Sequence, residues 1–475
     1  MAEAAPNHST RHAGAMPLPE TVALVLQGGG ALGSYQAGVA EALAEGGIEI
    51  DWVSGISIGA VNAALIAGNP PEKRVGALRD FWTTVSSSLP SFPILGDERE
   101  REFLHEWSAA FVALSGVPGF FRPRMLSPTF APPGSAAALS YYDPSPLVAG
   151  NPPECRVERL RAFWAKLSST LLSFPIVDNP YFREALHEIS AGSVAMAGVP
   201  GFFRPRLVSP VFATPGSVEA MSYYDSSPLI ETLDDLVDWD LLNDGPVRLS
   251  VGAVDIESGN FRYFDSRDTR IDTRHIMASG ALPPGLPPVE IDGRWYWDGG
   301  IVSNTPLTYL LEEQRGEMLV FQVDLFAATA AERPRTIMDV MAREKEIRFS
   351  SRTRQVSTEA MKILAAREAV RALLDELPAK LRETPAARKC AELATDRPVN
   401  LVQLIYRANA WEGGSRDYEF SARTMREHWQ AGQAAVAQAM ANARLVAENI
   451  ATGKSASFDL SKPVLSKPVL SKGVS

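Results

Sequence analysis

The sequence has few cysteines and no long apolar run, and both scarcities exclude classes of protein. Its 2 cysteines, Cys155 and Cys390, lie far apart without the spacing of metal ligands, so neither a zinc site nor a disulfide framework is supported. No apolar run approaches the roughly 18 to 20 residues that cross a bilayer, and the first residues lack the apolar stretch of a secretory signal. We expect no metal, a reducing cytoplasmic compartment, and only peripheral contact with any membrane or lipid surface.

The sequence also lacks an excess of positive charge. Lys and Arg number 46 against 56 Asp and Glu, which gives a formal net charge of −10. Because nucleic-acid binding proteins normally present a basic face, we expect no nucleic-acid partner. With 45% hydrophobic and 21% charged residues, the chain of 475 residues has the composition of a globular protein that can bury a full core.

Four regions follow one another along the chain. Residues 1–20 are polar and without periodicity, and we expect them to be disordered. Residues 21–326 alternate β-rich runs such as TVALVLQ and MLVFQVDLF with helical stretches, which is typical of an α/β layered sheet and marks the expected catalytic domain. Residues 327–452 have apolar residues at helical spacing and predict a helical extension. The repeated LSKPV within residues 453–475 predicts a flexible tail.

The catalytic region contains a tandem duplication. GNPPEKRVGALRDFW at Gly68 returns as GNPPECRVERLRAFW at Gly150, and GVPGFFRPR occurs later in each unit. The two units, residues 68–148 and 150–230, align without a gap. Two copies are too few for a solenoid, so we expect one copy to occupy the fold's normal place and the other to form an insertion or a cap. The paired phenylalanines of GVPGFFRPR suit either a lipid-facing lip or simple packing under a loop.

The segment VALVLQGGGALGSYQAG allows two interpretations. An apolar run of β-forming residues leads into glycines with the spacing G-x-G-x-x-G, as in a dinucleotide-binding turn. Asp51 lies near the position of the acidic residue that would hold a ribose. In the alternative, the backbone N–H groups near Gly29, Gly30 and Ala31 point at an oxyanion.

A second motif, GISIG, favours the oxyanion interpretation. Gly55, Ser57 and Gly59 form G-x-S-x-G between a predicted strand and a predicted helix, the context of a nucleophile elbow. A serine on such a turn adopts a strained backbone, so its neighbours must lack side chains that would collide, and the following helix N-terminus favours developing negative charge. Ester hydrolysis explains both motifs, whereas cofactor binding does not explain the serine. A tight turn with a capping serine is the structural alternative.

A serine nucleophile needs a base, and two residues are candidates. His275, in DTRHIMASG, lies close to other suggestive residues, and its structural alternative is a histidine at a helix start. Asp298, in WYWDGGIVSN, follows aromatic residues that would partly desolvate its carboxyl group and raise its pKa towards the useful range. The alternative for Asp298 is an ordinary D-G-G turn.

Together these residues resemble the patatin-like phospholipase family. The resemblance covers about residues 21–326, interrupted by the duplication, and rests on GGGALG, GISIG and DGG in that order. It implies a three-layer α/β/α sandwich with a mainly parallel sheet, and a Ser–Asp dyad without histidine, formed here by Ser57 and Asp298. Many members carry lysine or arginine in the glycine loop, where this chain has Leu32. The resemblance assigns the oxyanion hole to Gly28, Gly29, Gly30, Ala31 and Gly33, and the elbow to Gly55 and Gly59.

The predicted activity is hydrolysis of carboxylic esters by a lipid acyl hydrolase, with a lipid or other acyl ester as substrate. This mechanism needs neither a metal nor an organic cofactor. Two other functions stay open. One is a catalytically impaired lipid-binding protein, because a duplication directly after the nucleophile helix could distort the site. The other is an NAD-type oxidoreductase that uses the glycine turn. The sequence leaves the oligomeric state open.

Overall fold

The structure is a computed structural model that describes most of the chain outside the duplicated region. The described residues are 11–13, 16–86, 122–123, 142–143, 191–192, 194–195, 198–327, 329, 333–334, 337–394, 397–408, 412 and 415–460. The chain divides into two units, residues 1–87 with 180–475 and residues 88–179. The second unit is described only at β5 (Arg122–Pro123) and β6 (Tyr142–Asp143), an antiparallel pair. The sheet, the helices and the site below belong to the first unit.

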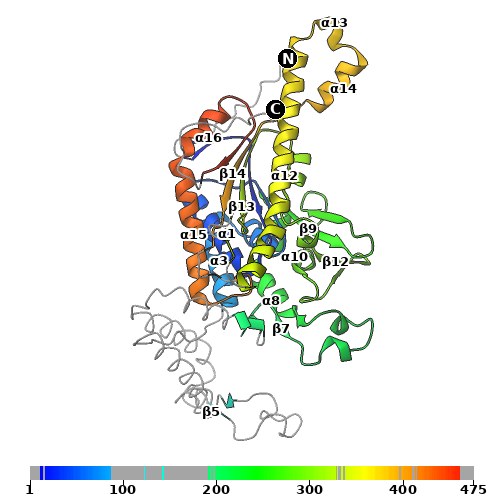
Figure 1. The fold of residues 1–475 in the computed structure, drawn as a ribbon, viewed down its shortest axis with the longest axis vertical. Helices are drawn as coiled ribbons and strands as arrows, with labels where there is room; N and C mark the ends of the chain where they lie inside the picture. The colour runs from blue at the N-terminus through cyan, green and yellow to red at the C-terminus, as the bar shows by residue number, and fades with distance from the viewer. Residues whose placement is uncertain are drawn as a thin grey trace. The chain divides into compact units, whose positions relative to one another are not determined.

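A nine-stranded sheet forms the centre of the first unit (Figure 1). Strands β9, β4, β3, β13, β14 and β15 run parallel in that spatial order. Strands β10 and β12 pair with β9 antiparallel, and β11 pairs with β12 antiparallel. The bounds are β3 (Thr21–Leu26), β4 (Trp52–Gly55), β9 (Arg248–Asp255), β10 (Phe261–Asp265), β11 (Val289–Ile291), β12 (Arg294–Asp298), β13 (Met318–Asp324), β14 (Val399–Ile405) and β15 (Ala456–Asp459).

The central strands are apolar along their whole length because both faces of the sheet are covered. Along β3, Val22, Leu24 and Leu26 pack into one buried cluster, whereas Ala23 and Val25 pack into another. Successive side chains of a strand point to opposite faces, so this division places one core on each side of the sheet. Parallel strands covered on both faces read as continuous apolar runs, which is what VALVL does.

Helices form the two outer layers. Side chains of α1, α2 and α15 join the first core, and those of α11 and α12 join the second; Figure 1 shows α15 and α12 on opposite sides of β13 and β14. The predicted three-layer α/β/α sandwich with a mainly parallel sheet is therefore confirmed. The bounds are α1 (Gly33–Glu45), α2 (Ile58–Ala67), α3 (Pro71–Val85), α8 (Ser227–Leu236), α9 (Trp239–Asp244), α10 (Thr273–Gly280), α11 (Leu307–Glu312), α12 (Ile337–Glu376), α13 (Ala379–Arg382), α14 (Pro385–Leu393), α15 (Ala422–Ala441) and α16 (Ala443–Ile450).

The C-terminal region is helical, as predicted, but it also extends the sheet. Strand β14 pairs with β13, and β15 pairs with β14. Strand β15 lies inside the predicted tail 453–475, whose residues 461–475 are outside the described residues. At the other end, β2 (Met16–Leu18) pairs with β1 (Arg11–Ala13) within the segment expected to be disordered, and Leu18 is buried in the first core.

The described residues of the duplicated region come from both copies. Helix α3 belongs to the first copy and buries Leu78, Phe81 and Trp82. The second copy supplies β7 (Arg204–Pro205), β8 (Tyr224–Asp225) and the start of α8, together with the 3-10 helices η5 (Pro210–Phe212) and η6 (Val218–Met221). The later part of the first copy, apart from β5 and β6, and the early part of the second lie outside the described residues. Whether one copy alone occupies the fold's normal place therefore stays a prediction.

Candidate active site

Ser57 stands on a strained turn between β4 and α2. Its backbone dihedral angles are φ 57° and ψ −126°, a region that residues with a side chain rarely adopt. A Cβ atom added at Gly55 would lie 2.1 Å from the carbonyl oxygen of Gly59, and one added at Gly59 would lie 2.4 Å from the carbonyl oxygen of Leu26. Both glycines of G-x-S-x-G are thus required by close backbone approach.

Ser279, at the end of α10, holds this turn in place. The Ser57 N–H donates to both the carbonyl oxygen and the Oγ of Ser279, each at 3.1 Å. The Ser279 hydroxyl in turn donates to the carbonyl oxygen of Gly252 in β9, at 2.7 Å. Ser279 is fully buried, so the elbow is supported by a hydrogen-bonded group that belongs to the core rather than by solvent.

Asp298 ends β12, is buried and borders the same cavity as Ser57. The pairing of β12 with β9, in which Asp298 lies opposite Ala253, carries this carboxyl group to the edge of the sheet that holds Ser57. Burial raises the pKa of Asp298 to about 7, against the lowering effect of its hydrogen bonds with Ser57 and with the Gly300 N–H. Its Oδ1 accepts the Gly300 N–H at 2.7 Å. The structure therefore brings together the two residues predicted for the dyad.

The glycine loop after β3 faces the same cavity through Gly28, Gly29 and Gly30. Two predicted oxyanion donors are already engaged, since the Ala31 N–H donates to the Asp417 carbonyl oxygen at 2.9 Å and the Gly33 N–H donates within the 3-10 turn η1 (Gly30–Leu32).

The remaining donors of the loop differ in their availability. The Gly28 N–H has a long contact of 3.4 Å with the Asn304 carbonyl oxygen. Among the described residues, the N–H groups of Gly29 and Gly30 have no acceptor. Of the five N–H groups predicted to form an oxyanion hole, those of Gly29 and Gly30 are therefore the two without an acceptor among the described residues. Ile58, at the start of α2, also borders the cavity and was not among the residues predicted for the site.

Asn304 is a site residue that the sequence did not reveal. Its Nδ2 donates to the Gly28 carbonyl oxygen at 2.9 Å, and a Cβ added at Gly28 would lie 2.5 Å from its Oδ1. Asn304 is buried and thereby joins the glycine loop to the turn that follows Asp298. In the sequence it looks like any asparagine in a polar turn before Pro306, so no local signal distinguishes it.

The C-terminal region contributes a second unpredicted part of the site. Ser415, Asp417, Tyr418 and Phe420 line the cavity. Lys345, on α12, pairs with the Asp417 carboxylate, and its ammonium lies 4.6 Å from the centre of the Tyr418 ring. The backbone of Asp417 is thus anchored where its carbonyl oxygen receives the Ala31 N–H.

The cavity beside Ser57 has a volume of about 620 Å³ and mainly apolar walls. Phe202 and Phe203, from the second GVPGFFRPR, are part of these walls, and Phe202 also packs against Phe81 and Phe420. Their equivalents in the first copy, Phe120 and Phe121, lie outside the described residues. A cavity of this size and lining suits an apolar ligand.

Comparison with known families identifies the chain. Residues 24–311, more than half of the sequence, match the family described as patatin-like phospholipase. The chain belongs to the patatin-like phospholipase family. A second match, to a family described as patatin phospholipase, covers residues 347–450, the region that supplies Asp417 and α15.

Curated relatives of this patatin-like chain share short segments with it. A putative patatin-like phospholipase domain-containing protein of Caenorhabditis elegans is 44% identical over 62 residues, 13% of this chain and 6% of that protein. A lysophospholipase of Aspergillus terreus is 60% identical over 47 residues, 10% of this chain and 3% of that protein. The chain therefore matches only a small part of the length of these relatives.

Two solved structures align with most of the patatin-like chain. VipD from Legionella pneumophila covers 87% of this chain and 67% of its own, with 16% identity and a TM-score of 0.29. The type III effector ExoU covers 92% of this chain and 62% of its own, with 15% identity and a TM-score of 0.22.

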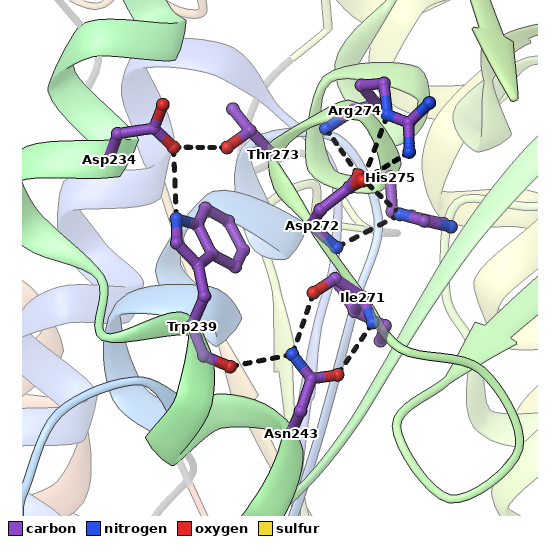
Figure 2. A network of polar contacts seen from close by, with 8 residues as sticks. All are labelled: Asp234, Trp239, Asn243, Ile271, Asp272, Thr273, Arg274 and His275. Atoms are coloured by element: carbon purple, nitrogen blue, oxygen red, sulfur yellow. Dashed lines mark hydrogen bonds and ion pairs between the residues drawn. The ribbon is translucent and has the colours of Figure 1, made fainter.

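His275, the other base candidate of this patatin-like chain, has a structural role in the contacts that are described. Its Nδ1 takes part in the capping box of α10 with Asp272, and its ring packs edge-on against Phe264. Figure 2 shows His275 within the polar network around the start of α10, beside Asp272 and Arg274. The alternative of a histidine at a helix start therefore describes it.

Asp51, the residue that a dinucleotide would need, lies at the wrong end of the sheet. It precedes β4, and its Oδ2 accepts the Val22 N–H at the start of β3, at 2.8 Å. Because β3 and β4 are parallel, Asp51 is at their amino ends, whereas the glycine loop follows the carboxyl end of β3. The acidic residue of a dinucleotide site belongs at the carboxyl edge, near the glycine turn.

No described helix of this patatin-like chain is both long enough and apolar enough to cross a membrane. The described residues also contain no group of three or more His, Cys, Asp or Glu side chains placed to hold a metal ion.

Proposed function

We propose that this chain hydrolyses carboxylic ester bonds of lipids, with Ser57 as the nucleophile and Asp298 as its base. The observation that carries the proposal is that Ser57, on its strained turn, and the buried carboxyl group of Asp298 border one cavity. This pair borders an apolar cavity beside backbone donors, and the chain belongs to a family of phospholipases. Geometry, environment and family thus point to the same chemistry.

The reaction proceeds in two steps. Asp298 accepts the Ser57 hydroxyl proton while Oγ attacks the ester carbonyl carbon, and the N–H groups of Gly29 and Gly30 stabilise the oxyanion. Collapse expels the alcohol, which takes the proton from Asp298, and leaves an acyl-Ser57. A water molecule then gives a proton to Asp298 and its hydroxide to the acyl carbon. Collapse of this second intermediate breaks the bond between the acyl carbon and Oγ and releases the carboxylic acid, while Oγ takes the proton back from Asp298. This restores the Ser57 hydroxyl and the Asp298 carboxylate, and no redox step or cofactor is required.

The environment of Asp298 suits this task. A base works best when its pKa lies near the working pH, and burial brings the pKa of Asp298 to about 7. The apolar lining suits the acyl chain of a lipid, because removal of hydrocarbon from water favours binding. Leu32, which stands where many family members carry a cation, is fully buried in the first core.

Paired substitutions test the dyad. Ser57→Ala and Asp298→Asn should each abolish turnover of a p-nitrophenyl ester, and the double variant should be no worse than either, because members of one catalytic unit are not additive. Ser54→Ala is the matched serine control, since the buried Ser54 hydroxyl has no partner in the described structure. Asp324→Asn is the matched carboxyl control, because burial raises the pKa of Asp324 to about 7 as well. Both controls should retain turnover.

A serine-directed fluorophosphonate should label the wild type and both controls, but not Ser57→Ala. Turnover that persists in Ser57→Ala or in Asp298→Asn would contradict the assignment. Lipid binding without turnover or labelling in the wild type would instead favour a lipid-binding protein with an impaired site. Thermal stabilisation by NAD without labelling would favour the oxidoreductase.

A further inference from the structure

An exposed apolar tip lies on the second copy of the duplicated unit. Strands β7 and β8 pair as the two legs of an excursion, and the Arg206 N–H extends the pairing by donating to the Tyr223 carbonyl oxygen. Between the legs, Leu207 is 102% exposed, Val211 80% and Phe212 83%, and Val208 is also exposed. In Figure 1 this excursion is the green segment that follows β7. We call Leu207, Val208, Val211 and Phe212 the apolar tip.

The apolar tip has a defined backbone despite its exposure. The Phe212 N–H donates to the Ser209 carbonyl oxygen at 2.9 Å, and the Ser217 N–H donates to the Thr214 carbonyl oxygen at 3.0 Å. At the base, two guanidinium nitrogens of Arg206 donate to the Ser222 hydroxyl. Large apolar side chains held outward by an ordered segment mark an interaction surface more often than a random surface does.

Charge narrows the kind of partner. Residues 207–218 contain no charged side chain. Arg204, in the first leg, is paired with Asp225 in the second at 2.9 Å. A hydrogen bond with its own backbone and the Arg206 cation lower the pKa of Glu219, so the charges of Arg206 and Glu219 also offset each other and the base of the excursion is close to neutral. The whole chain has a formal net charge of −10. An uncharged tip on an acidic protein suits an uncharged partner surface, because an anionic one would repel the chain.

The base of the excursion is continuous with the cavity. Phe203, Tyr223 and Tyr224 line the cavity beside Ser57. The N–H groups of Tyr223 and Tyr224 donate to the carbonyl oxygens of Pro284 and Gly285, two further lining residues, at 3.1 Å and 2.9 Å. A surface that received the apolar tip would therefore lie next to the wall of the site. This continuity favours a source of substrate over an unrelated protein partner.

We propose that the apolar tip inserts into the acyl region of an uncharged or zwitterionic lipid surface and docks the cavity there. The inference rests on the proposed lipid hydrolase function and specifies how that site reaches an aggregated substrate. Binding is driven by burial of the four apolar side chains, as for other interfacial anchors, and is independent of ionic attraction. It is therefore strongest on phosphatidylcholine and insensitive to salt.

Vesicle partitioning tests the docking separately from hydrolysis. Full-length Ser57→Ala protein is mixed with phosphatidylcholine vesicles, and the bound fraction is measured by flotation at low and high salt. Adding Val211→Ser and Phe212→Ser should lower the partition coefficient about a hundredfold, since burial of one such side chain corresponds to roughly tenfold. The matched control carries Leu373→Ser and Leu393→Ser, two exposed apolar positions on α12 and α14, and should bind unchanged.

Activity measurements in protein that retains the wild-type Ser57 separate the docking proposal from the proposed function. Val211→Ser with Phe212→Ser should leave turnover of a monomeric soluble ester unchanged and reduce turnover of the same acyl chain presented in vesicles. Unchanged partitioning of the tip variant, or binding that needs anionic lipid and disappears at high salt, would overturn the docking proposal. A concentration-dependent dimer without lipid, lost in the tip variant, would assign the tip to a second copy of the chain and also overturn it. Turnover retained by Ser57→Ala would instead contradict the proposed function. It would leave the docking proposal to be decided by the partitioning assay, which needs no hydrolysis.

Discussion

A single buried carboxyl group links the proposed activity to pH. Asp298 must be ionised to accept the Ser57 proton, and burial raises its pKa to about 7. We therefore expect kcat/KM for a neutral ester to rise with pH and to level off above an apparent pKa near 7. The pH profile of a p-nitrophenyl ester measures this. An inflection below pH 5, typical of a solvated carboxyl group, would contradict a base whose pKa is raised by burial.

The same burial should make Asp298 destabilising at high pH. A folded pKa of about 7 against an ordinary value of 3.8 means that the folded state retains a proton that the unfolded state loses between these values. The contribution of Asp298 to the free energy of unfolding is thus fully present below pH 3.8 and is lost as pH rises through about 7. The shift corresponds to about 4 kcal/mol. Asp298→Asn should raise the free energy of unfolding at pH 8 by up to about this amount, with the gain shrinking towards pH 4.

Thermal or urea unfolding at several pH values checks this prediction, and Asp255 provides a control of opposite sign. The N–H of Ser258 and the guanidinium of Arg294 lower the pKa of Asp255 to about 2, so Asp255→Asn should lose stability above pH 4 rather than gain it. A loss of stability in Asp298→Asn at pH 8 would mean that its ionised form is well solvated or paired in the folded protein.

Local motifs predict only part of this site. Ser57 and Asp298 could be predicted because a strained elbow and a D-G-G turn each require particular neighbours within a few residues. Asn304 and Asp417 could not, because their roles consist of contacts with Gly28 and Ala31, hundreds of residues away in the chain. The engagement of the Ala31 N–H by Asp417 was unpredictable for the same reason.

At the scale of elements, the sheet was predictable where strands are long and buried. TVALVLQ and MLVFQVDLF appear as β3 and β13 because both faces of these strands are covered by helices. Strand β14, with the sequence VNLVQLI, lies among strongly helical segments, and β15 follows the end of α16. Their strand state depends on pairing with β13 and with each other, which no local pattern reveals. The predicted helical extension is therefore also part of the sheet.

The segment between β14 and α15 should control the geometry of the oxyanion donors. Lys345 anchors Asp417, whose carbonyl oxygen receives the Ala31 N–H. Lys345→Met should release this anchor and lower kcat about tenfold or more with KM nearly unchanged, because small displacements of preorganised groups are costly in catalysis. Lys345→Arg, which keeps the charge, should recover most of the loss.

The matched control for this anchor is Arg348→Met on the same helix. Arg348 is exposed and pairs with Glu344 within α12, so its loss should leave kcat unaltered. The pH profile of Lys345→Met should keep its inflection near 7, since Asp298 is untouched. An effect confined to KM, or one equalled by Arg348→Met, would argue against a positioning role.

At the scale of the whole molecule, the described fold combines parts of both repeats. Helix α3 comes from the first copy and the excursion β7–β8 from the second, while residues 88–179 form a separate unit. The constant offset of the repeats makes residues 87 and 169 equivalent, so many different deletions of one repeat length leave one complete copy. They differ only in which copy supplies each position.

Deletion of one repeat length should leave a folded hydrolase, with ester turnover kept or increased if the extra unit partly covers the cavity. Removing residues 68–149 replaces α3 by the corresponding stretch of the second copy, where Arg159 takes the place of the buried Ala77. Removing residues 88–169 keeps α3 intact, including the hydrogen bond from Trp82 to Asn62 in α2. Both variants should fold, and the second should have the higher melting temperature, because it introduces no cation at a buried position.

Circular dichroism and calorimetry measure folding and melting, and the p-nitrophenyl ester assay measures turnover. If both variants fold but neither cleaves any ester that the wild type cleaves, the extra copy is required for the site. The interpretation of that copy as a dispensable insertion would then be wrong.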